Sequence, residues 1–222
     1  MISVNGGEAN RFAERISTDN LHLSPDSKYR IIPTNVKVDK VFGLDYYPEM
    51  KNSNVQIYES LQYRHWDTWE DGEFSHLFVA KHDGIDKGLD IMEGKPFTCP
   101  TEPFGGAEDF TWSPDSKSIV YVTKESTGTE YTQSTNTDIF QYNLELKKTV
   151  NLTKENKGYD MSPSFSKSGK LAWLAMERDG YEADKNDIII KTDKGNVNIT
   201  KSWDGSVNGF KWSNDEKKIY FT

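Results

Sequence analysis

A turn motif that recurs along the chain limits the possible folds more than any other feature of the sequence. Each copy reads as an apolar residue, a serine, a tight turn, a lysine and then a strand pattern. Ser-Pro-Asp-Ser is typical of a β-turn, because proline presets φ and aspartate bonds the backbone two residues on. The serines that mark the four copies are Ser24, Ser113, Ser166 and Ser213.

The spacing of these serines is typical of a repeat protein. The intervals are 89, 53 and 47 residues, and the blades of a β-propeller recur about every 40–50 residues. Around the turns, apolar and polar residues alternate as in strands with one buried face. The sequence therefore predicts an all-β chain, a partial β-propeller built from four-stranded antiparallel blades.

Two further signals keep the phase of the repeat. The segments Asn151-Leu152-Thr153 and Asn198-Ile199-Thr200 each begin 15 residues before a marker serine, and Asp138 and Asp187 lie 49 residues apart. We interpret both Asn-X-Thr segments as parts of the blade repeat and not as glycan sites.

The repeat also predicts the domain organisation. The long first interval holds no second Ser-Pro-Asp turn, so one long blade with an insertion around 40–72 is favoured over two ordinary blades. We expect helix to be minor and confined to that insertion. Both ends of the chain carry hairpin or strand signals, so we expect it to be part of a longer protein. The predicted units are a terminal piece 1–18, the long blade 19–100, blades 105–154 and 158–201, and the start of another blade at 205–222.

Charge and hydropathy exclude several classes of partner. Lys and Arg number 27 against 35 Asp and Glu, a net charge of −8. Nucleic acids and anionic membrane surfaces attract clustered positive charge, so we expect neither as a partner. No apolar run approaches the roughly 18–20 residues of a membrane span. Aromatic residues make up 13% of the chain, which indicates a globular core built partly from rings.

The motifs of several catalytic and metal sites are missing from the sequence. It has no Gly-X-Ser-X-Gly elbow, no glycine-rich phosphate loop and no Cys or His pair with zinc spacing. Its single cysteine, Cys99, has no partner for an internal disulfide. We therefore expect no catalytic residue, no metal and no cofactor in this chain.

One segment, residues 63–71, is both aromatic and charged, and two interpretations stay open. It is either a loop anchored by tryptophans on the neighbouring blade, or a lip at the propeller mouth that meets a substrate or another domain. In the second case Trp66 and Trp69 would anchor the loop, and Glu70 and Asp71 would bind a peptide's α-ammonium group. The candidate binding or domain-interface residues are Arg64, His65, Trp66, Asp67, Trp69, Glu70 and Asp71.

The chain resembles the propeller of the prolyl oligopeptidase family of serine peptidases. The Ser-Pro-Asp-Ser-Lys turns are similar to its PD40-type blade repeats, which TolB-like and WD40-like propellers share. The segment Tyr63-Arg64-His65-Trp66-Asp67-Thr68-Trp69-Glu70-Asp71-Gly72 resembles more specifically the dipeptidyl peptidase V and acylaminoacyl-peptidase branch. The resemblance covers essentially the whole chain.

The resemblance implies a function for the parent protein. In that family the propeller caps a C-terminal α/β-hydrolase domain that carries the Ser, Asp and His of proteolysis, and this chain contains no such domain. The parent would release dipeptides, and this part would gate and position peptide substrates. Bacterial relatives are commonly periplasmic, which implies a periplasmic or secreted parent and leaves the cytoplasm open. Half a propeller exposes apolar faces, so self-association or modest stability of the isolated chain is expected. The alternative is a TolB-like or WD40-like propeller that binds a protein partner and has no peptidase activity.

Overall fold

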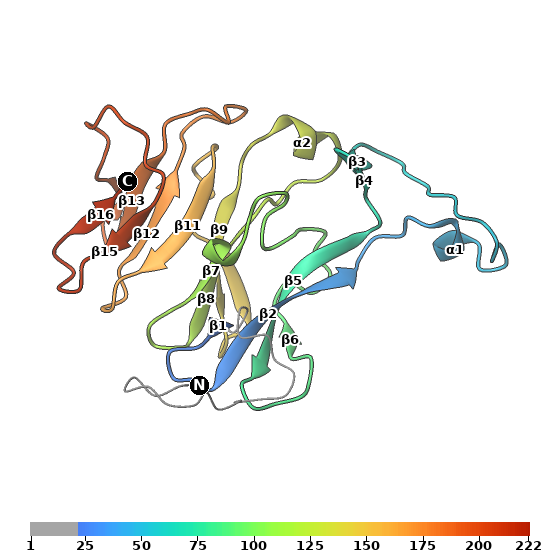
Figure 1. Ribbon diagram of the computed structural model, residues 1–222, viewed down its shortest axis with the longest axis horizontal. Helices are drawn as coiled ribbons and strands as arrows, with labels where there is room; N and C mark the ends of the chain where they lie inside the picture. The colour runs from blue at the N-terminus through green and yellow to red at the C-terminus, as the bar shows by residue number, and fades with distance from the viewer. Residues whose placement is uncertain (1–21) are drawn as a thin grey trace, which may run out of the picture.

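Antiparallel strands that follow one another in sequence build the fold. The computed structural model describes residues 22–222, and the predicted terminal piece 1–18 lies outside the described residues. Three four-stranded sheets and a two-stranded hairpin stand side by side like the blades of a fan (Figure 1). The predicted fold class is confirmed: the chain is a partial β-propeller of four-stranded antiparallel blades.

Each complete blade is a single sheet. Blade 1 consists of β1 (His22–Leu23), β2 (Tyr29–Lys37), β5 (Glu73–Lys81) and β6 (Leu89–Asp90). Blade 2 consists of β7 (Phe110–Trp112), β8 (Ser118–Thr123), β9 (Asp138–Asn143) and β10 (Lys148–Asn151). Blade 3 consists of β11 (Asp160–Phe165), β12 (Leu171–Ala175), β13 (Asp187–Thr192) and β14 (Gly195–Asn198).

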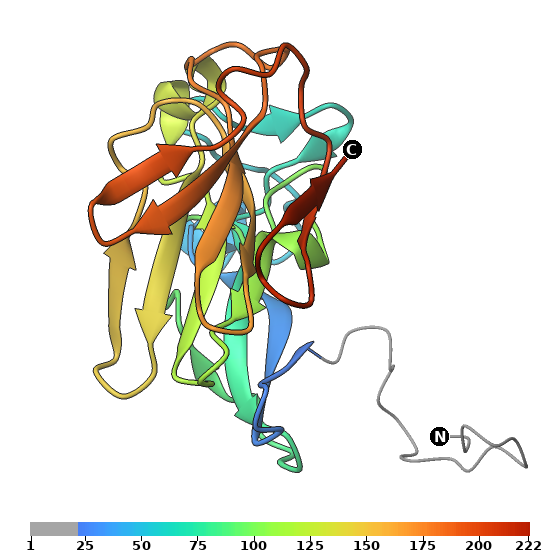
Figure 2. The same cartoon turned by 90° about the vertical axis from the view of Figure 1, so that its left-hand side faces the viewer.

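The last strands of the chain form the hairpin of β15 (Phe210–Trp212) and β16 (Ile219–Phe221). Figure 2, turned so that this hairpin faces the viewer, shows it in front of the three sheets.

Residues 38–72, which we call the insertion, connect the two longest strands of blade 1. β2 and β5 pair over nine residues on either side of it. The insertion contains the short helix α1 (Gly43–Tyr46) and a hairpin of β3 (Arg64–His65) and β4 (Thr68–Trp69). It leaves the sheets as an arm and returns beside the helix α2 (Gly128–Gln133) (Figure 1).

Apolar side chains fill the spaces between neighbouring blades. Because successive residues of a strand point to opposite faces, each blade supplies one set of side chains to each neighbour. Ile119 and Tyr121 of β8 face blade 1, whereas Val120 and Val122 face blade 3. A third cluster, around Ile188, joins blade 3 to the last hairpin.

The marker serines close the blade turns as the sequence pattern predicts. Ser113 donates its hydroxyl hydrogen to Asp115 over 2.6 Å, and the same carboxylate accepts the Lys117 N–H over 3.0 Å. Ser24 and Ser213 make the corresponding bonds with Asp26 and Asp215. An aspartate two residues after the serine therefore locks the turn.

The third turn lacks this aspartate and borrows a carboxylate from its neighbour. Ser168 stands in the aspartate position, and Glu216 of the following hairpin accepts the Ser168 N–H over 2.7 Å. Ser116 makes the related contact between blades 1 and 2, where its hydroxyl accepts the Asp26 N–H. These two side chains hold neighbouring turns in register.

The two Asn-X-Thr segments have the same structural role in blades 2 and 3. Asn151 donates its amide to Asp138 over 2.9 Å, and Asn198 donates to Asp187 over 2.9 Å. The threonine two residues later bonds the same aspartate and accepts an N–H from the adjoining strand. Both segments close the outer strand of a blade, as their phase in the repeat indicates.

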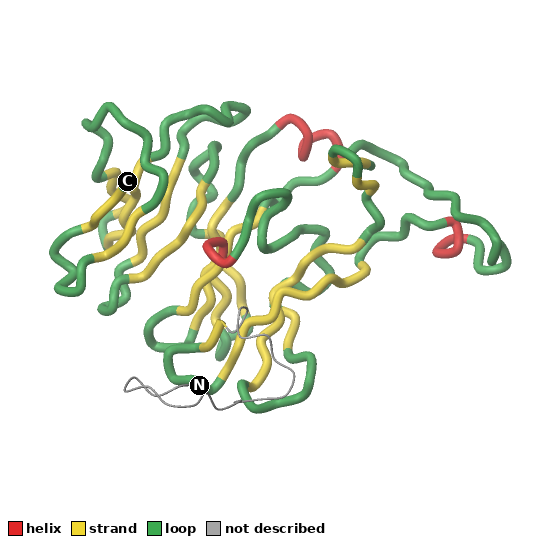
Figure 3. The backbone as a smooth tube through the Cα atoms, in the orientation of Figure 1, coloured by secondary structure: helices red, strands yellow, loops and turns green. Residues whose placement is uncertain are grey.

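The prediction that helix is confined to 40–72 was wrong. Besides α1, the structure has α2 in the connection between β8 and β9, and the 3-10 turn η2 (Ala107–Asp109) before β7 (Figure 3). The Lys124 ammonium group donates to the carbonyls of Tyr131 and Ser134, at the end of α2. This local interaction stabilises a helical turn that the sequence does not predict, because residues 128–133 have no apolar periodicity.

Candidate functional site

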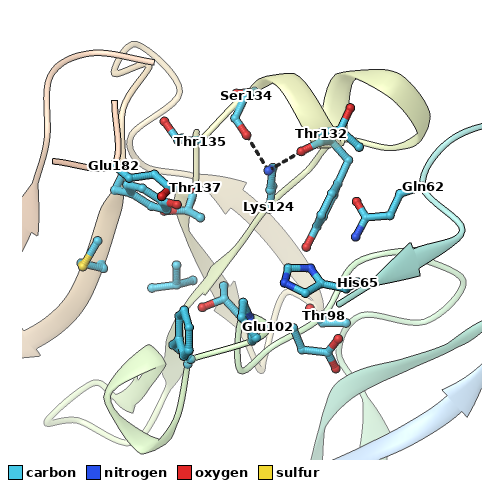
Figure 4. A pocket seen from close by; sticks show the side chains of 18 of the residues that line it. Gln62, His65, Thr98, Glu102, Lys124, Thr132, Ser134, Thr135, Thr137 and Glu182 are labelled. Atoms are coloured by element: carbon cyan, nitrogen blue, oxygen red, sulfur yellow. Dashed lines mark hydrogen bonds between the residues drawn. The ribbon is translucent and has the colours of Figure 1, made fainter. Parts of the chain in front are cut away.

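A cleft of about 1480 Å³ lies where the insertion meets the loops at one end of the blades. Its walls come from four parts of the chain that are distant in sequence. Figure 4 shows Gln62 and His65 on one side and Thr135, Thr137 and Glu182 on the other. The contributing segments are 61–69 of the insertion, 98–109 before blade 2, 122–137 of blade 2 with α2, and 159–162 with 176–183 of blade 3.

Aromatic stacking within the insertion holds the base of its hairpin. The Trp69 ring stacks on Tyr58 and Tyr63, with centroids 6.2 and 5.9 Å away. The Tyr58 hydroxyl donates to the Glu70 carbonyl over 2.6 Å. The Arg64 guanidinium lies over the Trp69 ring at 5.7 Å. These contacts hold β3 and β4 in place, and all the residues that make them belong to the insertion.

Trp66 occupies the tip of this hairpin and does not anchor it on the blade. Its side chain is 68% exposed, and its φ of +50° places the residue in the left-handed region. Its ring packs edge-to-face on Phe104, with centroids 5.6 Å apart. The expectation that Trp66 and Trp69 anchor the loop on its blade was therefore wrong, because Trp66 is largely exposed and contacts Phe104, and Trp69 stacks on tyrosines of the insertion itself.

Phe104 is carried by a tightly closed loop before blade 2. The Asp109 carboxylate accepts the backbone N–H and the hydroxyl of Thr101, over 2.8 and 2.6 Å. A Cβ atom at Gly105 would collide with the Thr101 carbonyl and the Asp109 carboxylate. Burial raises the pKa of Asp109. The closed loop presents Phe104 with 79% of its side chain exposed.

Two carboxyl groups lie near each other beneath the hairpin. Glu102 lines the cleft (Figure 4), whereas Glu70 is half-buried outside the cleft lining and accepts a long bond from the Gln62 amide. Burial raises the pKa of Glu70, and the negative charge of Glu102 raises it further.

The opposite wall is held by charged side chains bonded to backbone groups. Lys124 donates to two carbonyls of α2 over 2.6 Å each, and its ammonium lies 4.0 Å above the Tyr131 ring centroid. Burial lowers the pKa of Lys124. The Asp179 carboxylate accepts the Ser134 hydroxyl and the Thr135 N–H, which ties the blade 3 loop to the end of α2.

The structure brings together only part of the set of residues predicted from the sequence. Asp71 accepts the Glu73 N–H at the start of β5, away from the cleft lining. Glu102 and Phe104, by contrast, belong to a loop that was not predicted as part of the site. The two prolines at 100 and 103 were the sequence signal that could have indicated this loop. The predicted residues that line the cleft are Arg64, His65, Trp66 and Trp69; Asp67, Glu70 and Asp71 do not.

Two further observations concern the described part of the chain, residues 22–222. No helix in it is long and apolar enough to cross a membrane. It also holds no group of three or more His, Cys, Asp or Glu residues placed to bind a metal ion.

The sequence of this chain is similar to those of several proteins named dipeptidyl-peptidase 5. Dipeptidyl-peptidase 5 of Porphyromonas gingivalis is 40% identical over 205 residues, which are 90% of this chain and 30% of that protein. The chain is a homologue of part of dipeptidyl-peptidase 5. The enzymes of that name from Porphyromonas endodontalis and Schizosaccharomyces pombe are 38% and 30% identical, over 72% and 84% of this chain. The chain spans only 23–30% of the length of these three dipeptidyl-peptidases 5.

The other comparisons add little to this relationship. A solved structure of TolB from Acinetobacter baumannii superposes with a TM-score of 0.39 and 16% identity, covering 66% of this chain and 42% of TolB. No model of a protein family matches the chain.

Proposed function

We propose that this chain is the propeller part of a serine-type dipeptidyl peptidase, and that it gates and positions peptides for a hydrolase domain elsewhere in the full-length protein. The observation that carries the proposal is the 40% identity to a dipeptidyl-peptidase 5 over 90% of the chain. The chain corresponds to 30% of that enzyme, which leaves ample length for a catalytic domain.

The charges of the cleft suit the free end of a peptide. A dipeptidyl peptidase must recognise an α-ammonium group, because it counts residues from the N-terminus. Glu102 lines the cleft, and Glu70, whose pKa is raised by burial and by the charge of Glu102, lies outside the lining. An ammonium group bound there gains charge-assisted hydrogen bonds, which are about twice as strong as neutral ones. Binding also stabilises the charged form of Glu70.

The walls of the cleft suit a gating role. The α2 wall is fixed by Lys124 and Asp179, whereas the insertion reaches the loop before blade 2 through the contact of Trp66 with Phe104. We propose that the free end of a peptide enters this cleft and that a folded chain does not. Specificity would then depend on access and on the ammonium contact, and bond cleavage on the hydrolase domain.

The test is dipeptide release by the full-length product of the gene, measured with dipeptidyl chromogenic substrates. Glu102→Gln is expected to lower kcat/KM by about ten- to a hundredfold, because the neutral amide loses the charge-assisted hydrogen bonds to the ammonium group. Each tenfold loss in kcat/KM corresponds to about 1.4 kcal/mol. Glu70→Gln should act in the same direction with a smaller effect. Glu130→Gln, an exposed acid of α2 outside the cleft lining, is the matched control.

Two results would overturn the proposal. One is a full-length product that releases no dipeptides, which would favour a protein-binding propeller. The other is unchanged activity in both Glu102→Gln and Glu70→Gln. The isolated chain is expected to react with neither substrate nor a fluorophosphonate probe, because acyl transfer needs a nucleophile, a base and an oxyanion hole together.

A further inference from the structure

The outer part of the insertion exposes several large apolar side chains to solvent. Residues 41–57, which we call the lobe, contain α1 and lie apart from the three sheets (Figure 1). Exposed apolar residues gathered in one segment commonly mark an interaction surface. The large apolar side chains of the lobe that are between 38% and 51% exposed are Phe42, Leu44, Tyr46, Tyr47, Met50 and Val55.

The lobe is held together by its own hydrogen bonds. The Asp45 carboxylate accepts the backbone N–H groups of Val41 and Phe42 over 2.9 Å each. The Gly43 N–H donates to the Val55 carbonyl over 2.8 Å and joins the two sides of the lobe. A Cβ atom at Gly43 would collide with the Val55 side chain, so the two sides approach closely. The lobe therefore presents its apolar side chains in fixed positions.

The lobe continues directly into the hairpin that lines the cleft. Tyr58 follows its last residue, stacks on the Trp69 ring and donates its hydroxyl hydrogen to the Glu70 carbonyl over 2.6 Å. Both residues of β3 and Trp69 of β4 belong to the cleft lining. A partner that holds the lobe therefore also holds one wall of the cleft.

We propose that the lobe docks on the hydrolase domain of the full-length protein, and that this contact holds the insertion hairpin at the edge of the cleft. The inference rests on the proposed function, which supplies that domain. The insertion leaves blade 1 at the end of the blades where the cleft lies (Figure 1). A catalytic domain that receives peptides from the cleft must lie at the same end.

The size of the apolar surface favours a domain of the same chain over a second copy. A free aromatic side chain presents about 150–250 Å², so the exposed side chains of the lobe present on the order of 500 Å² together. Two lobes packed on each other would bury about 1,000 Å² in total, less than the roughly 1,200–2,000 Å² of specific interfaces between proteins. Interfaces between domains of one chain bury about 600–1,500 Å², and the covalent link already holds the two domains close together.

A photocrosslink in the full-length product of the gene tests where the lobe lies. Tyr47→benzoylphenylalanine places a photoreactive group on the lobe and keeps a large aromatic side chain there, so folding is preserved. We expect a crosslink within one chain that joins the lobe to a peptide of the hydrolase domain, identified by mass spectrometry. Leu146→benzoylphenylalanine is the matched control and should give no such crosslink, because Leu146 is exposed in the turn after β9, at the opposite end of that strand from α2.

Two crosslinking results would overturn the docking of the lobe. One is a crosslink between two chains, which would assign the lobe to a second copy. The other is the absence of any crosslink to the hydrolase domain. Neither result depends on catalysis, whereas the proposed function stands or falls on dipeptide release by the unmodified full-length product.

Kinetics of the full-length product test whether docking of the lobe holds the hairpin. In the double variant Leu44→Ser and Tyr47→Ser, KM for dipeptidyl substrates is expected to rise about fivefold while kcat changes less than about twofold. Ile85→Ser with Leu146→Ser makes the same kind of change at exposed apolar residues of two blade turns and should leave both constants unchanged. An unchanged KM in the lobe variant would contradict the second part of the proposal.

Discussion

Trp173 and Trp66 show how differently the blades and the insertion use the same side chain. Trp173 is 1% exposed, and its indole N–H donates to Asp160 over 2.8 Å. It belongs to the apolar cluster that joins blades 2 and 3. Trp66 is 68% exposed and bonds no buried partner; its contacts are the edges of Phe104 and His65.

The blades and the insertion are therefore stabilised by different means. The blades share recurring contacts: serine–aspartate turns in blades 1 and 2, Asn-X-Thr closures in blades 2 and 3, and alternating apolar faces in all three. The insertion repeats nothing and is held by stacking among its own rings. Stability should therefore depend on the blades, and ligand recognition on the insertion.

The largest expected effect is that of Trp173→Ala. Removing a buried tryptophan costs about 3–5 kcal/mol, through lost burial and the cavity that remains. Here it also leaves the Asp160 carboxyl without the indole donor. Urea unfolding of the full chain measures the loss, with Trp66→Ala as the comparison at less than about 1 kcal/mol. Equal losses for the two variants would contradict the division between blades and insertion.

Asp160 predicts a pH dependence that also belongs to the blades. Burial raises its pKa to about 7, from an ordinary value of 3.8. Between pH 4 and 7 the folded state therefore binds more protons at this site than the unfolded state, and the stability contribution of Asp160 falls as pH rises.

Asp160→Asn keeps an acceptor for Trp173 and removes the titration. The difference in unfolding free energy between wild type and this variant should favour wild type most near pH 4 and decline toward pH 8. At 1.36 kcal/mol per unit, the change is on the order of 3 kcal/mol. Parallel stability curves over this range would show that Asp160 does not titrate there.

Sequence reasoning succeeded where the repeat is regular. Ser113 and Asp138 could be placed in turns and strands because the same residue types recur at fixed spacing, and each copy supports the others. It failed where a single local contact decides the structure. α2 depends on Lys124 bonding two carbonyls, and the exposure of Trp66 depends on tyrosines that stack elsewhere. Glu102 reaches the cleft only through the folding of a loop closed by Asp109.

A smaller effect is expected for the marker serines. Ser113 is buried, donates to Asp115 and accepts the Ser118 N–H over 2.9 Å. Ser113→Ala should cost about 1–2 kcal/mol, the penalty for leaving a buried N–H without its partner. Ser213→Ala removes the same bonds from an exposed turn and should cost less, since water replaces them. Thermal unfolding of the two variants measures the difference, and a reversed order would show that burial does not set it.

The smallest expected change in stability is that of Trp66→Asn, and it sharpens the comparison most. The substitution relieves a left-handed conformation that costs a bulky residue about 1–3 kcal/mol. It also removes the edge-to-face contact with Phe104, and such contacts contribute about 0.5–1.5 kcal/mol. The two effects oppose each other, so the free energy of unfolding should stay within about 1 kcal/mol of wild type, on either side. A tryptophan retained for packing would instead show a clear loss in chemical denaturation. An unchanged or raised stability is the result expected of a tryptophan that does not contribute to the core.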